Sequence, residues 1–262
     1  MIGWDAFIYF AVPALGCWLA SGTAALKGCR RTAIWTGTTG CIVFAAFITG
    51  LWITLGRPPM RTMGETRLWY SLFTLLSGLA TYRQRGYNWI LLFSTVVAGV
   101  FVLINLLRPE IHDQTLMPAL QSIWFIPHVS VYMFSYSVMG CAFLLALRGM
   151  CKPREEYLTA ADSMVYTGMA FLTFGMISGA IWAKQAWGHY WNWDPKETWA
   201  AITYLLYLLY IHLRIYDKKR RSKRFFYGLL ILAFAALQMC WWGVNYLPSA
   251  KEGSLHTYTM QQ

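Results

Sequence analysis

The sequence predicts an all-α fold: a polytopic membrane helical bundle of about eight transmembrane helices, with both termini on the outer side. Hydrophobic residues make up 57% of the 262 positions and charged residues only 13%, a composition typical of membrane proteins. Apolar runs long enough to cross a hydrocarbon layer of ~30 Å recur along the whole chain. Lys and Arg are concentrated in alternate loops, as the positive-inside rule predicts for cytoplasmic segments.

The first four predicted spans lie at about 4–26, 32–55, 67–82 and 87–108. The first run is long and follows no basic leader, so we expect a retained span rather than a removed signal. The third, LWYSLFTLLSGLATY, is short and contains Gly78 and several hydroxyl groups. We expect this span to be tilted or shielded by its neighbours.

The last four predicted spans lie at about 127–148, 162–183, 196–215 and 225–247. The fifth begins in WFIPHVSVYMFSY, where Pro127 suits the first helical position because its missing N–H costs nothing there. His128 follows directly, and the positive end of the helix dipole disfavours its protonation. We therefore expect a neutral imidazole, which is the form that a metal ligand requires.

The seventh span begins with a capping signal. Asp194 is placed as the N-cap, Pro195 as the first helical residue and Glu197 three residues beyond the cap. Capping is the expected immediate role of Asp194. The same helix N-terminus directs a partial positive charge at the preceding loop, where an anionic ligand is favoured.

The net charge of +11 arises mainly from four loops that the alternating topology places in the cytoplasm. In a soluble protein this charge suggests nucleic acid, but its location here predicts a lipid bilayer and no nucleic acid. The run DKKRRSKR, from Asp217 to Arg224, is interpreted as an anchor on anionic lipid headgroups. The basic residues of the four loops are Lys27, Arg30, Arg31, Arg83, Arg85, Arg148, Lys152, Arg154, Arg214, Lys218, Lys219, Arg220, Arg221, Lys223 and Arg224.

No internal repeat or long linker divides the chain, so the sequence predicts one integral membrane domain over residues 1–262. The six cysteines form no C-x-x-C pair and no C-x-x-C-H motif, which excludes thioredoxin-like dithiol chemistry and thioether-linked haem by that motif. None falls in a long outward loop, so we expect small buried side chains rather than disulfides.

The most informative motif is WGHYWNWDPKETW, from Trp187 to Trp199, which overlaps the predicted outward segment 184–199. An interfacial aromatic belt explains scattered tryptophans, but four within thirteen residues exceed that need. Indoles in a short loop can form an apolar platform for a large flat ligand. Four of the five histidines lie on the same predicted face: His112, His128, His189 and His256. A single histidine is more often a satisfied polar group than a ligand, but several imidazoles beside such a platform favour haem.

The fifth histidine, His212, lies about 17 residues into the seventh span, or roughly 25 Å from its outward end at 1.5 Å per residue. An ionisable group inside a span is a candidate functional residue, although a solvated interface residue is an equal alternative here. Arg214 is expected either to meet a carboxylate or to extend to the headgroups. Two separated histidine stations suggest passage of a ligand across the membrane.

The stretch WGHYWNWDPKETW closely resembles the tryptophan-rich WWD signature of haem-handling proteins, and its ending DPKETW resembles the CcsA/ResC branch of the cytochrome c maturation pathway. RPPMRTMGETRLWYS resembles the first outward loop of that branch, and WFIPHVSVYMFSYS resembles its segment with the first external histidine. YIHLR resembles its in-membrane histidine, and WWGVNYLPSAKEGSLHTY resembles the tail with the second external histidine. The likeness thus extends in matching order from about 56 to 258.

This resemblance implies a subunit of a two-component holocytochrome c synthase of the haem-lyase type, in the cytoplasmic (inner) membrane. It implies that haem b, held non-covalently, reaches an external WWD site facing the periplasm and is attached there to the CXXCH motif of apocytochrome c. The implied partners are a CcsB/ResB-type membrane protein and thiol-reducing proteins. The implied haem-iron ligands are His128 and His256 outside and His212 in the membrane. The implied haem-holding residues are Trp187, Trp191, Trp193, Asp194 and Trp199.

The chain lacks the fused CcsB portion of longer relatives, so the resemblance makes a partner chain necessary. The tail has PSAKEGSLH where a shorter glycine-rich connection is common, which bears on His256. Neither His112 nor His189 receives a role, and no residue is assigned as a general acid or base. Two alternatives are a CcmC-like protein that loads a haem chaperone without attachment chemistry, and a non-haem permease or assembly subunit with a simple aromatic belt.

Overall fold

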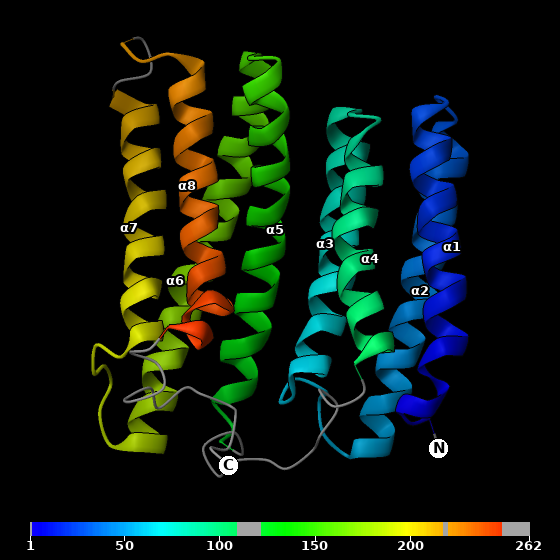
Figure 1. The fold of residues 1–262 in the computed structure, drawn as a ribbon, viewed down its shortest axis with the longest axis horizontal. Coiled ribbons are helices and arrows are strands. Elements are labelled where there is room, and N and C mark those ends of the chain that lie inside the picture. The colour runs from blue at the N-terminus through cyan, green and yellow to red at the C-terminus, as the bar shows by residue number, and fades with distance from the viewer. Residues whose placement is uncertain (1, 109–121, 217–219, 248–262) are drawn as a thin grey trace. The chain divides into compact units, whose positions relative to one another are not determined.

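The computed structural model describes residues 2–108, 122–216 and 220–247, and every element within these ranges is helical (Figure 1). The helices are η1 (Trp4–Ala6), α1 (Phe7–Leu26), α2 (Arg30–Leu55), α3 (Met63–Arg85), α4 (Ile90–Leu107), α5 (Phe125–Cys151), α6 (Glu155–Trp187), α7 (Pro195–Tyr216), α8 (Lys223–Trp241) and η4 (Gly243–Tyr246). They fall into two compact units, Met1–Leu116 and Met117–Gln262. The prediction of one haem-handling domain over the whole chain stays a prediction beside this division.

The predicted all-α membrane bundle is confirmed. Among the described residues, seven helices are long and apolar enough to cross a membrane, and the chain is an integral membrane protein. The eighth long helix, α3, spans 23 residues but does not reach the apolarity of the others. The described residues therefore contain the eight predicted long helices, of which the third is the one that is not apolar enough by composition to count as a span.

Helix α3 compensates for its polar composition by burial against its neighbours in the first unit. Ser71 is fully buried, and its hydroxyl donates to the Ala98 carbonyl of α4 at 3.3 Å. From α4, the buried amide of Asn105 donates to the Gly64 carbonyl at 3.0 Å. The expected shielding of this helix is confirmed, because polar side chains in the membrane are stable where other helices supply hydrogen-bond partners.

The core of the first unit is aromatic. Phe7 of α1 packs against Phe47 of α2 with ring centroids 4.8 Å apart, and Trp18 of α1 packs against Phe44 of α2 at 5.1 Å. All four side chains are almost completely buried. Offset and tilted aromatic pairs of this kind contribute beyond their buried area, so they hold α1 and α2 together.

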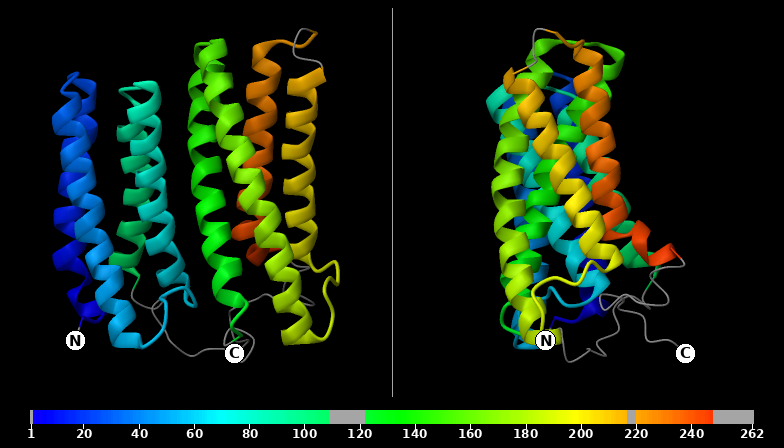
Figure 2. Two further views of the ribbon diagram at one scale, coloured as in Figure 1. Left: turned by 180° about the vertical axis from the view of Figure 1, so that it is seen from behind. Right: turned by 90° about the vertical axis from the view of Figure 1, so that its left-hand side faces the viewer.

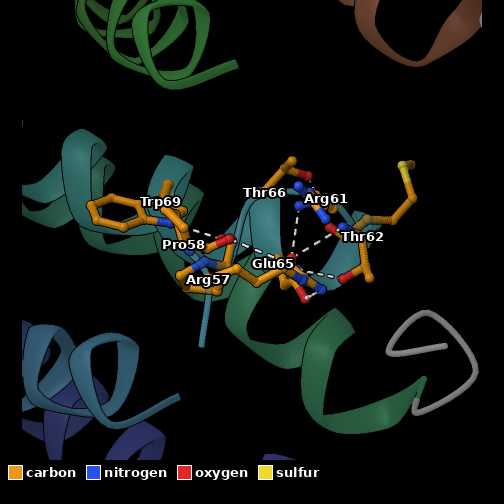
Figure 3. A network of polar contacts seen from close by, with 9 residues as sticks. Arg57, Pro58, Arg61, Thr62, Glu65, Thr66 and Trp69 are labelled. Atoms are coloured by element: carbon orange, nitrogen blue, oxygen red, sulfur yellow. Dashed lines mark hydrogen bonds and ion pairs between the residues drawn. The ribbon is translucent and has the colours of Figure 1, made fainter. Parts of the chain in front are cut away.

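The loop between α2 and α3 is organised around one buried carboxylate (Figure 3). Both guanidinium Nη atoms of Arg57 donate to Glu65 at 2.9 Å, and the Arg61 backbone N–H donates to the same carboxylate at 2.7 Å. Thr62 and Glu65 also form a capping box at the start of α3. Burial, with the nearby Arg57 guanidinium, lowers the pKa of Arg61, yet arginine stays protonated in proteins.

The second unit is built from α5 to α8, with α5 against α6, α7 against α8, and α8 also against α5 (Figure 2). Successive helices alternate in direction, so the start of α5, the end of α6 and the start of α7 lie at one end of this unit (Figure 1). Helix α6 begins at Glu155, well before its apolar run, because Glu155 and Glu156 interact favourably with its N-terminus.

All six cysteines are free thiols, as expected. Cys41, Cys141 and Cys240 are buried, in agreement with a packing role. For Cys29 and Cys151 the expectation of burial is wrong, because these residues lie at the start of α2 and the end of α5, where the chain leaves the packed helices.

Candidate functional site

His128 lies in the first turn of α5 and is oriented by α6. Its Nδ1 atom is 2.9 Å from the Gly175 carbonyl oxygen, and a carbonyl can only accept a hydrogen bond. Nδ1 therefore carries a proton, and in the neutral ring expected from the sequence the lone pair lies on Nε2. A hydrogen bond from one ring nitrogen to a backbone carbonyl is the usual way in which proteins fix the tautomer and orientation of a metal-binding histidine.

Two glycines of α6 make room for this arrangement. A Cβ atom at Gly179 would lie 2.6 Å from both Cε1 and Nδ1 of His128. A Cβ atom at Gly175 would lie 2.3 Å from Cδ1 of Tyr132, one turn further along α5. Small residues four positions apart let membrane helices approach closely, and here they form a shelf for the imidazole.

Aromatic rings connect His128 to the tryptophan-rich segment. The imidazole stacks on Trp182 with centroids 5.6 Å apart and planes at 21°, and Tyr132 lies 4.5 Å away on α5. Trp182 in turn meets Trp187 edge to face at 4.7 Å. The structure therefore brings His128 and the first WWD tryptophan into one aromatic cluster, through a residue that the sequence analysis missed. The GxxxG spacing of Gly175 and Gly179, followed by Trp182, was the available signal.

The predicted cap of α7 is confirmed. The Glu197 N–H donates to Oδ1 of Asp194 at 2.8 Å, while Oε2 of Glu197 accepts from the Asn192 N–H at 2.6 Å and the Asp194 N–H at 3.4 Å. Asp194 is only 5% exposed and Glu197 only 8%. The capping box thus fastens the end of the WWD segment to the first turn of α7.

Trp193 has an unusual backbone. Its φ is +56°, the only positive value outside glycine among the described residues, and its side chain is 69% exposed. A bulky residue in the left-handed region is strained, and such strain tends to be retained at functional sites. Its ring meets Trp191 edge to face at 5.6 Å. Trp199 lies in the first turns of α7 and makes no ring contact with these two indoles within the described residues.

The start of α7 also rests on α8. The Cys240 thiol donates to the Lys196 carbonyl at 3.5 Å and lies 3.9 Å from the Tyr136 hydroxyl. Tyr136 stacks on Tyr132 at 5.4 Å, next to His128. Three helices of the second unit therefore support the segment that carries the WWD motif.

His212 lies near the end of α7, whereas His128 lies in the first turn of α5. The end of α7 and the start of α5 are at opposite ends of the second unit (Figure 1). His212 is exposed, and its Nδ1 bonds to the Leu208 carbonyl of its own helix at 2.8 Å. Its ring also faces Tyr216 with centroids 6.4 Å apart. As at His128, the bond to a carbonyl places the proton on Nδ1 and the lone pair of the neutral ring on Nε2.

Arg214 follows the first of its two predicted alternatives, because it meets carboxylates. It is buried and pairs with Asp162 of α6 at 2.5 Å and with Glu155 at 3.1 Å. The Tyr210 hydroxyl also donates to Asp162 at 2.7 Å. This cluster ties α6 to α7. The histidines His112 and His256 lie outside the described residues.

Comparison with known proteins identifies a family and several relatives. The family profile for "Cytochrome C assembly protein" matches residues 60–250, a range that includes His128, the WWD segment and His212. The cytochrome c biogenesis protein CcsA of Guillardia theta is 30% identical, over 96% of this chain and 93% of its own length. CcsA of Cuscuta exaltata is also 30% identical, over 79% of this chain and 80% of its own. NrfI of Wolinella succinogenes is 33% identical over 84% of this chain but only 25% of its own length.

Among solved structures, a cytochrome c heme lyase CcmF covers 91% of this chain with a TM-score of 0.63 and 21% sequence identity. The chain spans 45% of the length of that structure. At this identity the likeness concerns the fold.

Proposed function

The chain belongs to the family of cytochrome c assembly proteins, and from this premise we propose that it is the membrane subunit of a cytochrome c synthase. It moves haem b, held non-covalently, to an external site at the WWD segment, and presents it for attachment to the CXXCH motif of apocytochrome c. A CcsB/ResB-type membrane protein acts with it, and thiol-reducing proteins keep the apocytochrome cysteines reduced. The WWD site faces the outer side of the cytoplasmic membrane.

One observation carries this proposal: the hydrogen bond from Nδ1 of His128 to the Gly175 carbonyl, in a ring that stacks on Trp182. It presents the Nε2 lone pair from a ring held on two sides, as an axial iron ligand requires. Trp187, Trp191, Trp193 and Trp199 are proposed to hold the flat face of the porphyrin, with Asp194 fixing the helix end beneath them. His256 is the proposed second ligand, and His212 is the proposed ligand on the route through the membrane.

The chemistry of attachment is an addition without external oxidant. Each thiol S–H of the substrate adds across one vinyl C=C bond, so that a C–S bond forms and the hydrogen goes to the other vinyl carbon. The residues of this chain bind and orient the porphyrin and exclude water from it. Holding reacting atoms in near-attack geometry can supply several kcal/mol of the barrier. The histidine of the CXXCH motif then replaces one axial histidine, which offers a route to product release.

The test is coexpression of this chain with a CcsB-type partner and a CXXCH reporter, in cells without other maturation machinery. We expect covalent haem on the reporter, and none on a reporter whose two cysteines are replaced by serine. Haem that copurifies with the chain but is never attached supports delivery to a chaperone, as in the CcmC-like alternative. A chain that carries no haem contradicts both haem-based functions.

The ligand assignment has its own test. We expect His128→Ala to lose the bound-haem absorbance and exogenous imidazole to restore it, because imidazole can occupy the space of the deleted ring. An unchanged haem spectrum in His128→Ala would show that the iron is ligated elsewhere.

A further inference from the structure

The segment between α6 and α7 contains two buried ring nitrogens that lack a hydrogen-bond partner within the described ranges: Nδ1 of His189 and Nε1 of Trp191. The side chains of this segment differ in how exposed they are. Tyr190 is 59% exposed and Trp193 is 69% exposed, whereas His189 and Trp191 are only partly exposed. Exposure therefore alternates from Gly188 to Asn192, and the rings of His189 and Trp191 are the less exposed ones.

Several acceptors of the same segment already have donors. The Gly188 carbonyl accepts from Nζ of Lys184 at 2.7 Å. The carboxylates of Asp194 and Glu197 accept backbone N–H groups in the capping box of α7. Because an indole N–H can only donate, Trp191 requires an acceptor from elsewhere. A buried donor without an acceptor is costly, so such groups usually mark the place of an absent polar partner.

One cationic side chain lies at the start of this segment, and the two carboxylates at its other end already accept backbone N–H groups. Lys184 stands at the end of α6, with its Nζ 5.5 Å from the centre of the Tyr190 ring, and its ammonium group adds positive charge to this segment. Hydrogen bonds from a neutral donor to an ionised acceptor are stronger than those between neutral groups. A carboxylate therefore satisfies both nitrogens better than a carbonyl oxygen does.

We propose that His189 and Trp191 donate hydrogen bonds to a carboxylate of the porphyrin, that is, to a haem propionate. This inference rests on the proposed function, because it gives the haem at the WWD segment a fixed orientation. The propionates and the vinyl groups lie on opposite sides of the porphyrin of haem b. Anchoring the propionate edge at His189 and Trp191 therefore turns the vinyl edge away from this segment, where substrate thiols have access.

The experiment compares the binding of haem with that of haem dimethyl ester, in which both propionates are neutralised, to the full-length purified protein. We expect the unsubstituted protein to bind the diester about tenfold more weakly than haem. In His189→Ala and in Trp191→Phe, this discrimination should fall to about threefold, since each variant loses one of the two donors that sense the charge. His189→Asn should recover most of the discrimination, because its amide nitrogen lies close to the position of Nδ1.

The matched control is Trp242→Phe, which removes an indole N–H from a tryptophan that is 51% exposed and packs on Tyr246. Its discrimination should equal that of the unsubstituted protein. A bound water at the two nitrogens would leave haem and diester equivalent in the unsubstituted protein, and this result overturns the proposal. Discrimination that persists in both variants places the propionates elsewhere and overturns it as well.

The experiment also distinguishes a haem propionate from a carboxylate of the substrate peptide. If the two variants slow attachment to the CXXCH reporter but leave the preference for haem over the diester unchanged, the carboxylate belongs to the substrate peptide and the propionate assignment is wrong. If the unsubstituted protein binds neither porphyrin, the proposed function itself fails. Binding with unaltered discrimination overturns only the role of His189 and Trp191.

Discussion

The most direct test of the geometry at His128 is Gly179→Ala. The added Cβ would lie 2.6 Å from Cε1 and Nδ1 of the imidazole, whereas ordinary contacts between such atoms begin at ~3.5 Å. The ring or the helix must therefore give by about 1 Å. Such a displacement weakens the 2.9 Å hydrogen bond to Gly175 and turns the lone pair of Nε2 away from its present direction.

The expected effect on folding is small. Overpacking costs about 1–3 kcal/mol, but alanine is favoured over glycine within a helix by about 1 kcal/mol. The net loss of stability is then at most about 2 kcal/mol. The effect on haem is larger, because loss of the group that orients a metal-binding histidine typically lowers affinity about 10–100-fold.

The assay is titration of the purified, detergent-solubilised protein with haem, followed by its absorbance, beside thermal unfolding. The matched control is Gly228→Ala on α8, where an added Cβ has no heavy atom within 4 Å. This control makes the same chemical change and should bind haem like the unsubstituted protein. If Gly179→Ala also binds haem like Gly228→Ala, then the shelf on α6 does not orient an iron ligand and the reasoning from the Gly175 hydrogen bond is refuted.

Three further predictions concern the elements around the site. Asp194→Ala should lower the unfolding free energy by about 1 kcal/mol through loss of the α7 cap, while Asp194→Asn should retain most of it; equal melting temperatures for the two would contradict the capping role. Trp193→Gly should keep or raise the melting temperature, because glycine relieves about 1–2 kcal/mol of left-handed strain, and should nevertheless weaken haem binding; a clear loss of stability would count against the strain. Arg214→Leu should lower the unfolding free energy by about 3 kcal/mol, because it leaves Asp162 without its cation. The control Arg220→Leu, at an exposed position, should change it by less than ~0.5 kcal/mol. Similar melting temperatures for the two variants would show that the buried pair does not stabilise the α6–α7 contact.

The helices and the cap of α7 were predictable because their signals are local. Apolar runs mark spans by length alone, and Asp194, Pro195 and Glu197 are close in sequence. The orientation of His128 was not predictable, because its partner carbonyl is 47 residues away and depends on how α5 packs on α6. The same holds for Arg214 and Asp162, which are 52 residues apart.

The left-handed backbone of Trp193 could not be predicted from the sequence either, since tryptophan rarely adopts this conformation and no sequence rule predicts it. For α3, the sequence led to an underestimate of how well the helix is accommodated in the bundle. Its hydroxyl groups lowered the apparent strength of the span, although partners such as the Ala98 carbonyl accept their hydrogen bonds within the first unit. Hydropathy counts each residue as if it faced lipid, so it undervalues helices that are packed among others.

Helix α7 carries the fastening of the WWD segment at its first turn and His212 near its last. A continuous helix of 22 residues is a stiff rod of roughly 33 Å, so its ends do not move independently. Any tilt or axial rotation of α7 that reorients His212 also displaces Asn192 and Asp194 through the capping box. The two proposed haem sites are therefore mechanically coupled. Binding of a ligand at one end of α7 can change the geometry at the other end without any contact between the two sites.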